Sequence, residues 1–180
     1  NRTAAYLLGS ALIGNGQPDK GQEIIDRVFR DDDSAEAHLL MGSILLVADD
    51  AQGALKEIER AVELNPKLPG VQGWHGRALM RLGDTERAKL AFKTELASNA
   101  NDFDSNLYLG ILFRQDKQVD DALAHLQRAV QLRPRERYAQ YHLAAVYGMA
   151  GKPGVALPLL EAVVKEYPDF VEARVLLASI

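Results

Sequence analysis

The sequence predicts an all-α array of stacked repeats, each built from a pair of amphipathic helices. Two columns of small residues recur at a spacing of 34 positions. The columns are Gly42, Gly76, Gly110 and Ala144, and Ala54, Ala88, Ala122 and Ala156. Apolar residues between these positions recur at steps of three and four, which predicts two helices in every repeat. Self-similarity at a fixed period is typical of a repeat protein in which each repeat packs on its neighbours.

We expect one array over residues 1–180, with five repeats and the first helix of a sixth. The predicted repeats are residues 2–34, 35–68, 69–102, 103–136 and 137–170, and the partial repeat is 171–180. In the first repeat, Leu8-Gly9, Leu12, Gly16, Gly21 and Ile25 occupy the recurring places.

The repeat at residues 35–68 shows the expected internal organisation. Its two apolar stretches are separated by a turn at Ala48-Asp49-Asp50, and Asn65-Pro66 ends the second helix. Small residues at Gly42, Ala54 and Ala61 would let the two helix backbones approach closely. We therefore expect Ala54→Leu to overpack the helix crossing and to lower stability.

Three local features carry further expectations. Asp33 with Glu36 resembles a capping box that opens the next helix. Pro158 predicts that the helix containing it either starts late or bends at the proline. Residues 171–180 form an apolar helix without a polar capping partner, so we expect either more chain after it or contact with another molecule.

Composition excludes several functional classes. The 21 basic and 25 acidic residues give a net charge of −4, and no basic stretch could follow a phosphate backbone, so we expect no nucleic-acid partner. The absence of cysteine excludes disulfides and thiolate metal sites. The longest apolar run, residues 39–48, is about half the roughly 20 residues that a membrane helix needs, so we expect no membrane insertion.

The compartment stays open between cytoplasm and periplasm. Because the sequence begins at Asn1 without a methionine, we expect either a removed leader or a piece of a longer chain.

The chain resembles the tetratricopeptide repeat family over essentially its whole length. The family pattern has, in order, Leu-Gly, a large residue, Ala, a large residue, Ala and Pro. In the predicted repeat 103–136 the matching residues are Leu109-Gly110, Phe113, Ala122, Leu126, Ala129 and Pro134. The resemblance implies antiparallel helix pairs in a right-handed superhelical solenoid, whose concave groove, lined by the first helices, holds a partner's peptide. The family's first large position is polar here, so we expect looser packing at His38, Gln72, Asn106 and Gln140.

Residues two places before the small Gly42-type positions should face that groove, because they are turned about 200° away from the helix crossing. This column contains Leu7, Leu40, Trp74, Tyr108, His142 and Leu176. Further residues on the same face are Arg77, Arg81, Ile111, Arg114, Tyr138 and Tyr141. Tryptophan, tyrosine and arginine dominate binding hot spots, and arginine pairs bidentately with carboxylates.

We therefore predict a protein-interaction scaffold that binds a partner segment with an apolar or aromatic anchor and acidic residues. The opposing interpretation is that Trp74 and Tyr141 only pack between adjacent first helices and that the arginines are solvated. A second alternative is a self-assembly module, acting through the groove and the C-terminal helix. A third is a regulatory arm of an enzyme that lies outside these residues.

No pattern indicates catalysis or a cofactor within the chain, and we do not expect an enzyme. The four histidines fall at different repeat positions without a metal-ligand motif, so we predict no metal site. Gly14-Asn15-Gly16 resembles the start of a phosphate loop but falls where each repeat turns, which favours a turn.

Overall fold

The computed structural model describes residues 33–180 without a break and, before them, residues 5, 8, 9, 12, 17, 19–21, 23 and 24. Several predicted features lie outside the described residues: Leu7, the Gly14-Asn15-Gly16 turn and Ile25. The chain divides into two compact units, residues 1–83 (unit 1) and residues 84–180 (unit 2). Each unit is described separately, and the single array stays a prediction.

Every regular element in residues 33–180 is an α helix, as the sequence predicts. Unit 1 contains α3 (Ala35–Val47), α4 (Ala51–Leu64) and α5 (Val71–Arg81). Unit 2 contains α6 (Thr85–Ser98), α7 (Phe103–Gln115), α8 (Val119–Leu132), α9 (Arg137–Met149), α10 (Pro153–Glu166) and α11 (Val171–Ser179). We call α3, α5, α7, α9 and α11 first helices, and α4, α6, α8 and α10 second helices.

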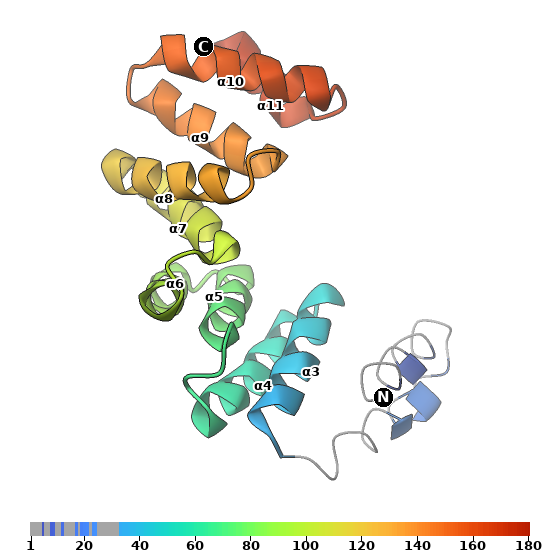
Figure 1. Cartoon of the computed structure of the whole chain (residues 1–180). Helices are drawn as coiled ribbons and strands as arrows, with labels where there is room; N and C mark the ends of the chain where they lie inside the picture. Colours follow the sequence, from blue (N-terminus) through green and yellow to red (C-terminus); the bar gives the residue numbers. More distant parts are fainter. Residues whose placement is uncertain are drawn as a thin grey trace. The chain divides into compact units, whose positions relative to one another are not determined.

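Helices that are consecutive in the chain pack on one another within each unit. In unit 1, α4 contacts both α3 and α5, and in unit 2 each helix from α6 to α11 contacts the next (Figure 1). First helices also meet directly, α3 with α5 and α7 with α9. Side chains of two successive repeats therefore lie next to each other within one unit.

Small residues bring the paired helices together, as predicted. A Cβ atom added to Gly42 would lie 2.4 Å from Ile58 Cγ1, and one added to Gly110 would lie 2.4 Å from Leu126 Cγ. Ala54, which lies on α4 in the contact between α3 and α4, is completely buried. A larger side chain at any of these positions must push the helices apart.

The turn between the two helices of a pair requires a left-handed backbone. Positive φ angles occur at Asp49 (66°), Gly83 (81°), Lys117 (60°) and Gly151 (67°), which are 34 positions apart. Glycine adopts this conformation without a steric penalty, whereas the Cβ atoms of Asp49 and Lys117 make it unfavourable.

The predicted capping box at Asp33 is wrong. The N-cap of α3 is Ser34, whose side chain accepts a hydrogen bond from the Ala37 amide at 3.2 Å. Because Ser34 directly precedes the first helical residue, its oxygen reaches the third amide of the helix. Asp33 instead pairs with Arg60 at 2.7 Å and His38 at 2.9 Å.

The predicted late start of the helix that contains Pro158 is also wrong. The helix α10 begins at Pro153 and continues through Pro158 to Glu166. Proline is tolerated at the first helical position because the amide there has no partner within the helix. The alternative that the sequence predicts, a bend at Pro158, stays a prediction.

The expected looser packing at Asn106 is not found. Asn106 is only 3% exposed, and its side-chain amide donates to the carbonyls of Ala100 (3.2 Å) and Asp102 (2.8 Å). Its oxygen lies 3.1 Å from His125 Nδ1 in α8. Hydrogen bonds therefore fix this polar side chain at a position where we expected looser packing.

Candidate functional site

The ten predicted site residues, which we call the candidate face, all belong to first helices. Unit 1 carries Leu40 on α3, with Trp74, Arg77 and Arg81 on α5. Unit 2 carries Tyr108, Ile111 and Arg114 on α7, with Tyr138, Tyr141 and His142 on α9. None of the ten is acidic, although the whole chain has a net charge of −4.

In unit 1, aromatic and charged groups of α5 interact with each other and with the turn between α3 and α4. The Arg77 guanidinium lies over the Trp74 ring, 4.2 Å from its centroid. Arg81 Nη1 pairs with Asp49 Oδ1 at 3.0 Å, and both side chains are exposed. Because water screens such an exposed pair, it contributes little to stability.

In unit 2, Tyr138 and Tyr141 of α9 belong to an aromatic cluster at the connection between α10 and α11. The ring of Phe170 lies 5.2 Å from Tyr138 and 5.3 Å from Tyr141, measured between centroids. The Arg137 guanidinium is 5.0 Å from the Tyr138 ring and 5.3 Å from the Phe170 ring. Phe170 is buried, whereas Tyr138 is 43% exposed and offers part of its surface to a partner.

Sequence reasoning missed Phe170 and Arg137 as neighbours of the predicted tyrosines. The type of residue directly before each first helix could have indicated the packing role of Phe170 from the sequence. Ser34, Asp102 and Glu136 accept hydrogen bonds there as N-caps, whereas Phe170 occupies the same place before α11 without a side-chain cap. An aromatic residue at a capping position indicates a packing role.

Next to this cluster, His142 on α9 and Arg114 on α7 are half-buried polar residues. The His142 ring lies 4.9 Å from the Tyr141 ring. His142 Nδ1 and Arg114 Nε are both buried without a hydrogen-bond partner among the described residues. Burial, together with the nearby positive charge of Arg114, lowers the pKa of His142 to about 4. His142 is therefore uncharged near neutral pH.

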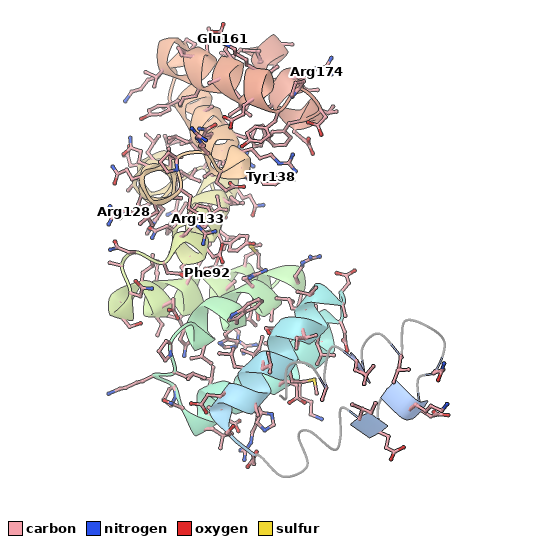
Figure 2. The ribbon with its side chains drawn as sticks, turned by 45° about the vertical axis from the view of Figure 1, so that its right-hand side comes forward. Phe92, Arg128, Arg133, Tyr138, Glu161 and Arg174 are labelled. Carbon is pink, nitrogen blue, oxygen red and sulfur yellow. The ribbon has the colours of Figure 1, made fainter. Side chains whose placement is uncertain are left out.

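The remaining predicted residues have other surroundings. Tyr108 stacks on Phe92 of α6 with ring centroids 5.5 Å apart, so at least one of its faces packs within unit 2. Ile111 and Leu40 are half-buried. Figure 2 shows the labelled Tyr138 and Arg128 on opposite sides of unit 2.

A second polar cluster lies at α3 and α4, away from the predicted residues. His38 Nδ1 is 2.7 Å from Glu57 Oε2, beside a surface pocket of about 500 Å³ that Lys56, Glu59 and Arg60 also line. Burial alone would lower the pKa of His38, but hydrogen bonds to Glu57 and Asp33 together raise it above its usual value. These groups satisfy one another, which is typical of a structural ion-pair network.

Within residues 33–180 and the few described before them, no group of three or more histidine, aspartate or glutamate side chains is arranged to hold a metal ion. Across the same described part of the chain, none of the helices combines the length and the apolar character needed to cross a membrane.

Comparison with protein families gives matches along most of the chain. One tetratricopeptide repeat model matches residues 6–69 and 75–137, and a second matches residues 138–169. Among curated proteins, the human protein O-mannosyl-transferase TMTC3 is 28% identical over 182 residues. The match covers 98% of this chain but only 20% of the length of that protein.

Solved structures support the same fold. MamA from Desulfovibrio magneticus RS-1 superposes with a TM-score of 0.74 at 19% identity, over 94% of this chain and 97% of that chain. YrrB, described as a tetratricopeptide repeat protein with an unusual peptide-binding site, gives a TM-score of 0.71 at 18% identity, over 94% and 88% of the two chains. At these identities the likeness is one of fold, and the fold is the all-α solenoid predicted from the sequence.

Proposed function

The chain belongs to the tetratricopeptide repeat family of protein-interaction scaffolds, and from that premise we propose that its first helices bind an extended segment of a partner protein. The segment carries an apolar or aromatic anchor together with aspartate or glutamate. The proposed contact residues are those of the candidate face, taken in each unit separately.

The observation that carries this proposal is the composition of the face in unit 2. Tyr138 and Tyr141 share contacts with Phe170, and Tyr141 contacts the ring of His142, which lies near Arg114. Aromatic rings with few rotamers provide contact area at low entropic cost, and arginine adds directional pairing with a carboxylate.

Charge supports an acidic partner segment. Among the proposed contact residues, unit 1 carries Arg77 and Arg81 and unit 2 carries Arg114, in a chain whose overall charge is negative. A basic surface on an acidic protein selects segments that bring negative charge to that place. The peptide-binding site named for YrrB provides a precedent for peptide recognition on this fold.

A binding experiment with defined peptides tests the proposal. Synthetic peptides of about 12 residues that combine tyrosine, phenylalanine or leucine with aspartate or glutamate would be titrated into the full chain, using fluorescence anisotropy of a label on the peptide. We expect saturable binding by a subset of these peptides. A Tyr138→Ala/Tyr141→Ala double variant should weaken binding at least about tenfold.

The matched control is Tyr147→Ala, which removes the same ring from the far end of α9. Tyr147 accepts a hydrogen bond from Gln127 in α8 and lies outside the candidate face. Equal weakening by both variants, or no binding by any peptide, would contradict the proposal.

A self-assembly module is the alternative that one observation favours. Val171 and Val175, four positions apart on α11, are 58% and 64% exposed and form an apolar strip on one side of the helix. Light scattering over a concentration series separates the two functions, because self-assembly must grow with concentration. A constant monomer mass would exclude the alternative, whereas growth that Val175→Glu abolishes would support it.

A further inference from the structure

Arg137, the first residue of α9, is an arginine surrounded by aromatic rings. The central carbon of its guanidinium lies 5.0 Å from the ring centroid of Tyr138, 5.3 Å from that of Phe170 and 5.8 Å from that of Tyr167. Among the residues that the structure describes, no carboxylate forms an ion pair with Arg137. Its positive charge is therefore held in place by rings and not by an acidic side chain.

Contacts within unit 2 hold these groups in position. Phe170 is only 4% exposed. The Tyr167 hydroxyl donates a hydrogen bond to the carbonyl of Arg135 at 2.8 Å, and Arg137 Nη2 donates to the Tyr138 hydroxyl at 3.4 Å. A guanidinium that is already oriented loses less conformational freedom when a ligand pairs with it.

A partner can reach this place. Tyr138 is 43% exposed, and Arg137 and Tyr167 are half-buried. No nitrogen of Arg137 is among the buried polar atoms that lack a hydrogen-bond partner, so the donors that Tyr138 does not use are open to solvent. A guanidinium carries several N–H donors in one plane, which leaves enough of them for a ligand.

We propose, on the basis of the function proposed above, that Arg137 and the rings around it form the subsite for the side-chain carboxylate of an aspartate or glutamate in the partner segment. The planar guanidinium can donate two parallel hydrogen bonds to the two oxygens of a carboxylate. The ring faces that pack against it supply the rest of the subsite.

Two acidic residues near the subsite favour a carboxylate over a phosphate. The Glu136 carboxylate accepts a hydrogen bond from the Ala139 amide at 2.7 Å, and Glu166 Oε1 lies 3.4 Å from the Tyr167 hydroxyl. A phosphate group carries a charge of about −1.5 to −2 near neutral pH, so these two acids repel it more strongly than they repel a singly charged carboxylate.

The exposed ring of Tyr138 restricts where the acidic residue lies in the partner. This ring is next to the Arg137 guanidinium, and Tyr141 contacts the same Phe170 ring at 5.3 Å. An extended chain advances about 3.3 Å per residue, so the acid and the anchor that packs on the tyrosines are about one to four positions apart. The predicted recognition element is a short one, with an acid close to an aromatic or aliphatic residue.

The test uses peptides that differ only in the acidic residue. The probes are labelled peptides of about 10 residues with one tyrosine or leucine, and one glutamate placed about one to four positions away, in a Ser-Gly background. Matched sets carry glutamine or phosphoserine in place of glutamate. Binding to the full chain is measured by fluorescence anisotropy, for the wild type, Arg137→Gln and the control Arg128→Gln. Arg128 lies on α8, on the other side of unit 2 from Tyr138 (Figure 2).

We expect the glutamate peptides to bind at least about tenfold more tightly than their glutamine counterparts. Arg137→Gln should remove this preference and leave the weaker binding of the glutamine peptides unchanged. Arg128→Gln should retain the preference. In the wild type, the NMR signal of the Arg137 Nε–H group should shift with the glutamate peptide and not with the glutamine peptide, which tests the subsite without a variant that could misfold.

Other outcomes separate this inference from the proposed function. Equal affinity for glutamate and glutamine peptides would overturn the carboxylate subsite and leave peptide binding intact. Tighter binding of phosphoserine than of glutamate would overturn the choice of carboxylate. Equal weakening of both peptide sets by Arg137→Gln would overturn the subsite in favour of a structural role, and no binding by any peptide would remove both proposals.

Discussion

At the scale of single residues, the environment of a side chain decides its chemistry more than its type does. His38 and His142 are both half-buried histidines on first helices. Hydrogen bonds to Glu57 and Asp33 raise the pKa of His38 above its usual value, whereas burial and the charge of Arg114 lower the pKa of His142 to about 4. The same residue type therefore serves a structural ion pair at one position and an uncharged polar group at the other.

The lowered pKa of His142 predicts a stability change with pH. Its folded-state pKa of about 4 lies below the unfolded value of 6.5, so the unfolded chain binds more protons between these values. The contribution of His142 to the free energy of unfolding should therefore be fully present above about pH 6.5 and decrease as the pH drops towards 4. At about pH 5 the loss from this group should be about 2 kcal/mol.

Urea unfolding at about pH 7.5 and 5 measures this loss. The control is the variant His142→Gln, in which residue 142 cannot bind a proton. The pH dependence of its stability therefore comes from all the other titratable groups. The variant should lose less stability than the wild type on acidification. Parallel pH profiles for the two proteins would contradict the buried, neutral state of His142.

At the scale of elements, one turn geometry recurs at four positions with three different residue types. The residue with positive φ between the helices of a pair is Asp49, Gly83, Lys117 or Gly151. Only the two glycines are free of the clash between Cβ and the backbone. The regular helix pair thus imposes its turn even where the sequence does not provide the favoured residue.

We expect Lys117→Gly to stabilise the protein by about 0.5 to 1 kcal/mol, because the left-handed conformation costs lysine about 1 to 2 kcal/mol and glycine loses part of that gain through greater unfolded-state entropy. Lys117→Ala is the matched control, since it shortens the side chain but keeps the Cβ atom. Chemical denaturation of the three proteins measures the effect. A glycine variant no more stable than the alanine variant would argue against strain at this turn.

At the scale of the whole molecule, the described residues form two compact units whose boundary falls between Gly83 and Asp84. This boundary divides the predicted repeat 69–102 between its two helices. The single array predicted from the sequence remains a proposal at this scale. It implies that the stabilities of the two units depend on each other. In a stacked repeat array, the stability of each repeat depends on its neighbours.

Ala54→Leu tests that claim. Ala54 is fully buried in unit 1, so leucine should overpack the crossing and cost about 1 to 3 kcal/mol. In a single array, the amides of α8 in unit 2 should also exchange faster with solvent in the variant, whereas independent units would leave them unchanged. Gln52→Leu adds the same side chain at an exposed position of α4 and should have little effect on either unit.

The helices and their pairing could be predicted from the sequence because they depend on local periodicity. The first helices begin at Ala35, Val71, Phe103, Arg137 and Val171, at or within two residues of the predicted repeat starts. From the sequence, the candidate face could be predicted only as a set of residues at equivalent places in successive repeats, without their neighbours. The neighbours of its residues come from other elements, as Phe170 and Phe92 do for Tyr141 and Tyr108.

The sequence by itself determined the all-α repeat fold and the family, because small residues at a spacing of 34 allow one way of pairing the helices. The tertiary structure alone decided that Asp33 pairs with Arg60 instead of capping α3, and that Asn106 is held by hydrogen bonds. It also decided that the side-chain atoms His142 Nδ1 and Arg114 Nε are buried without a hydrogen-bond partner among the described residues. The burial and the electrostatic environment of a side chain depend on residues that are distant in the sequence. The periodicity of apolar and small residues, in contrast, can be read directly from the sequence.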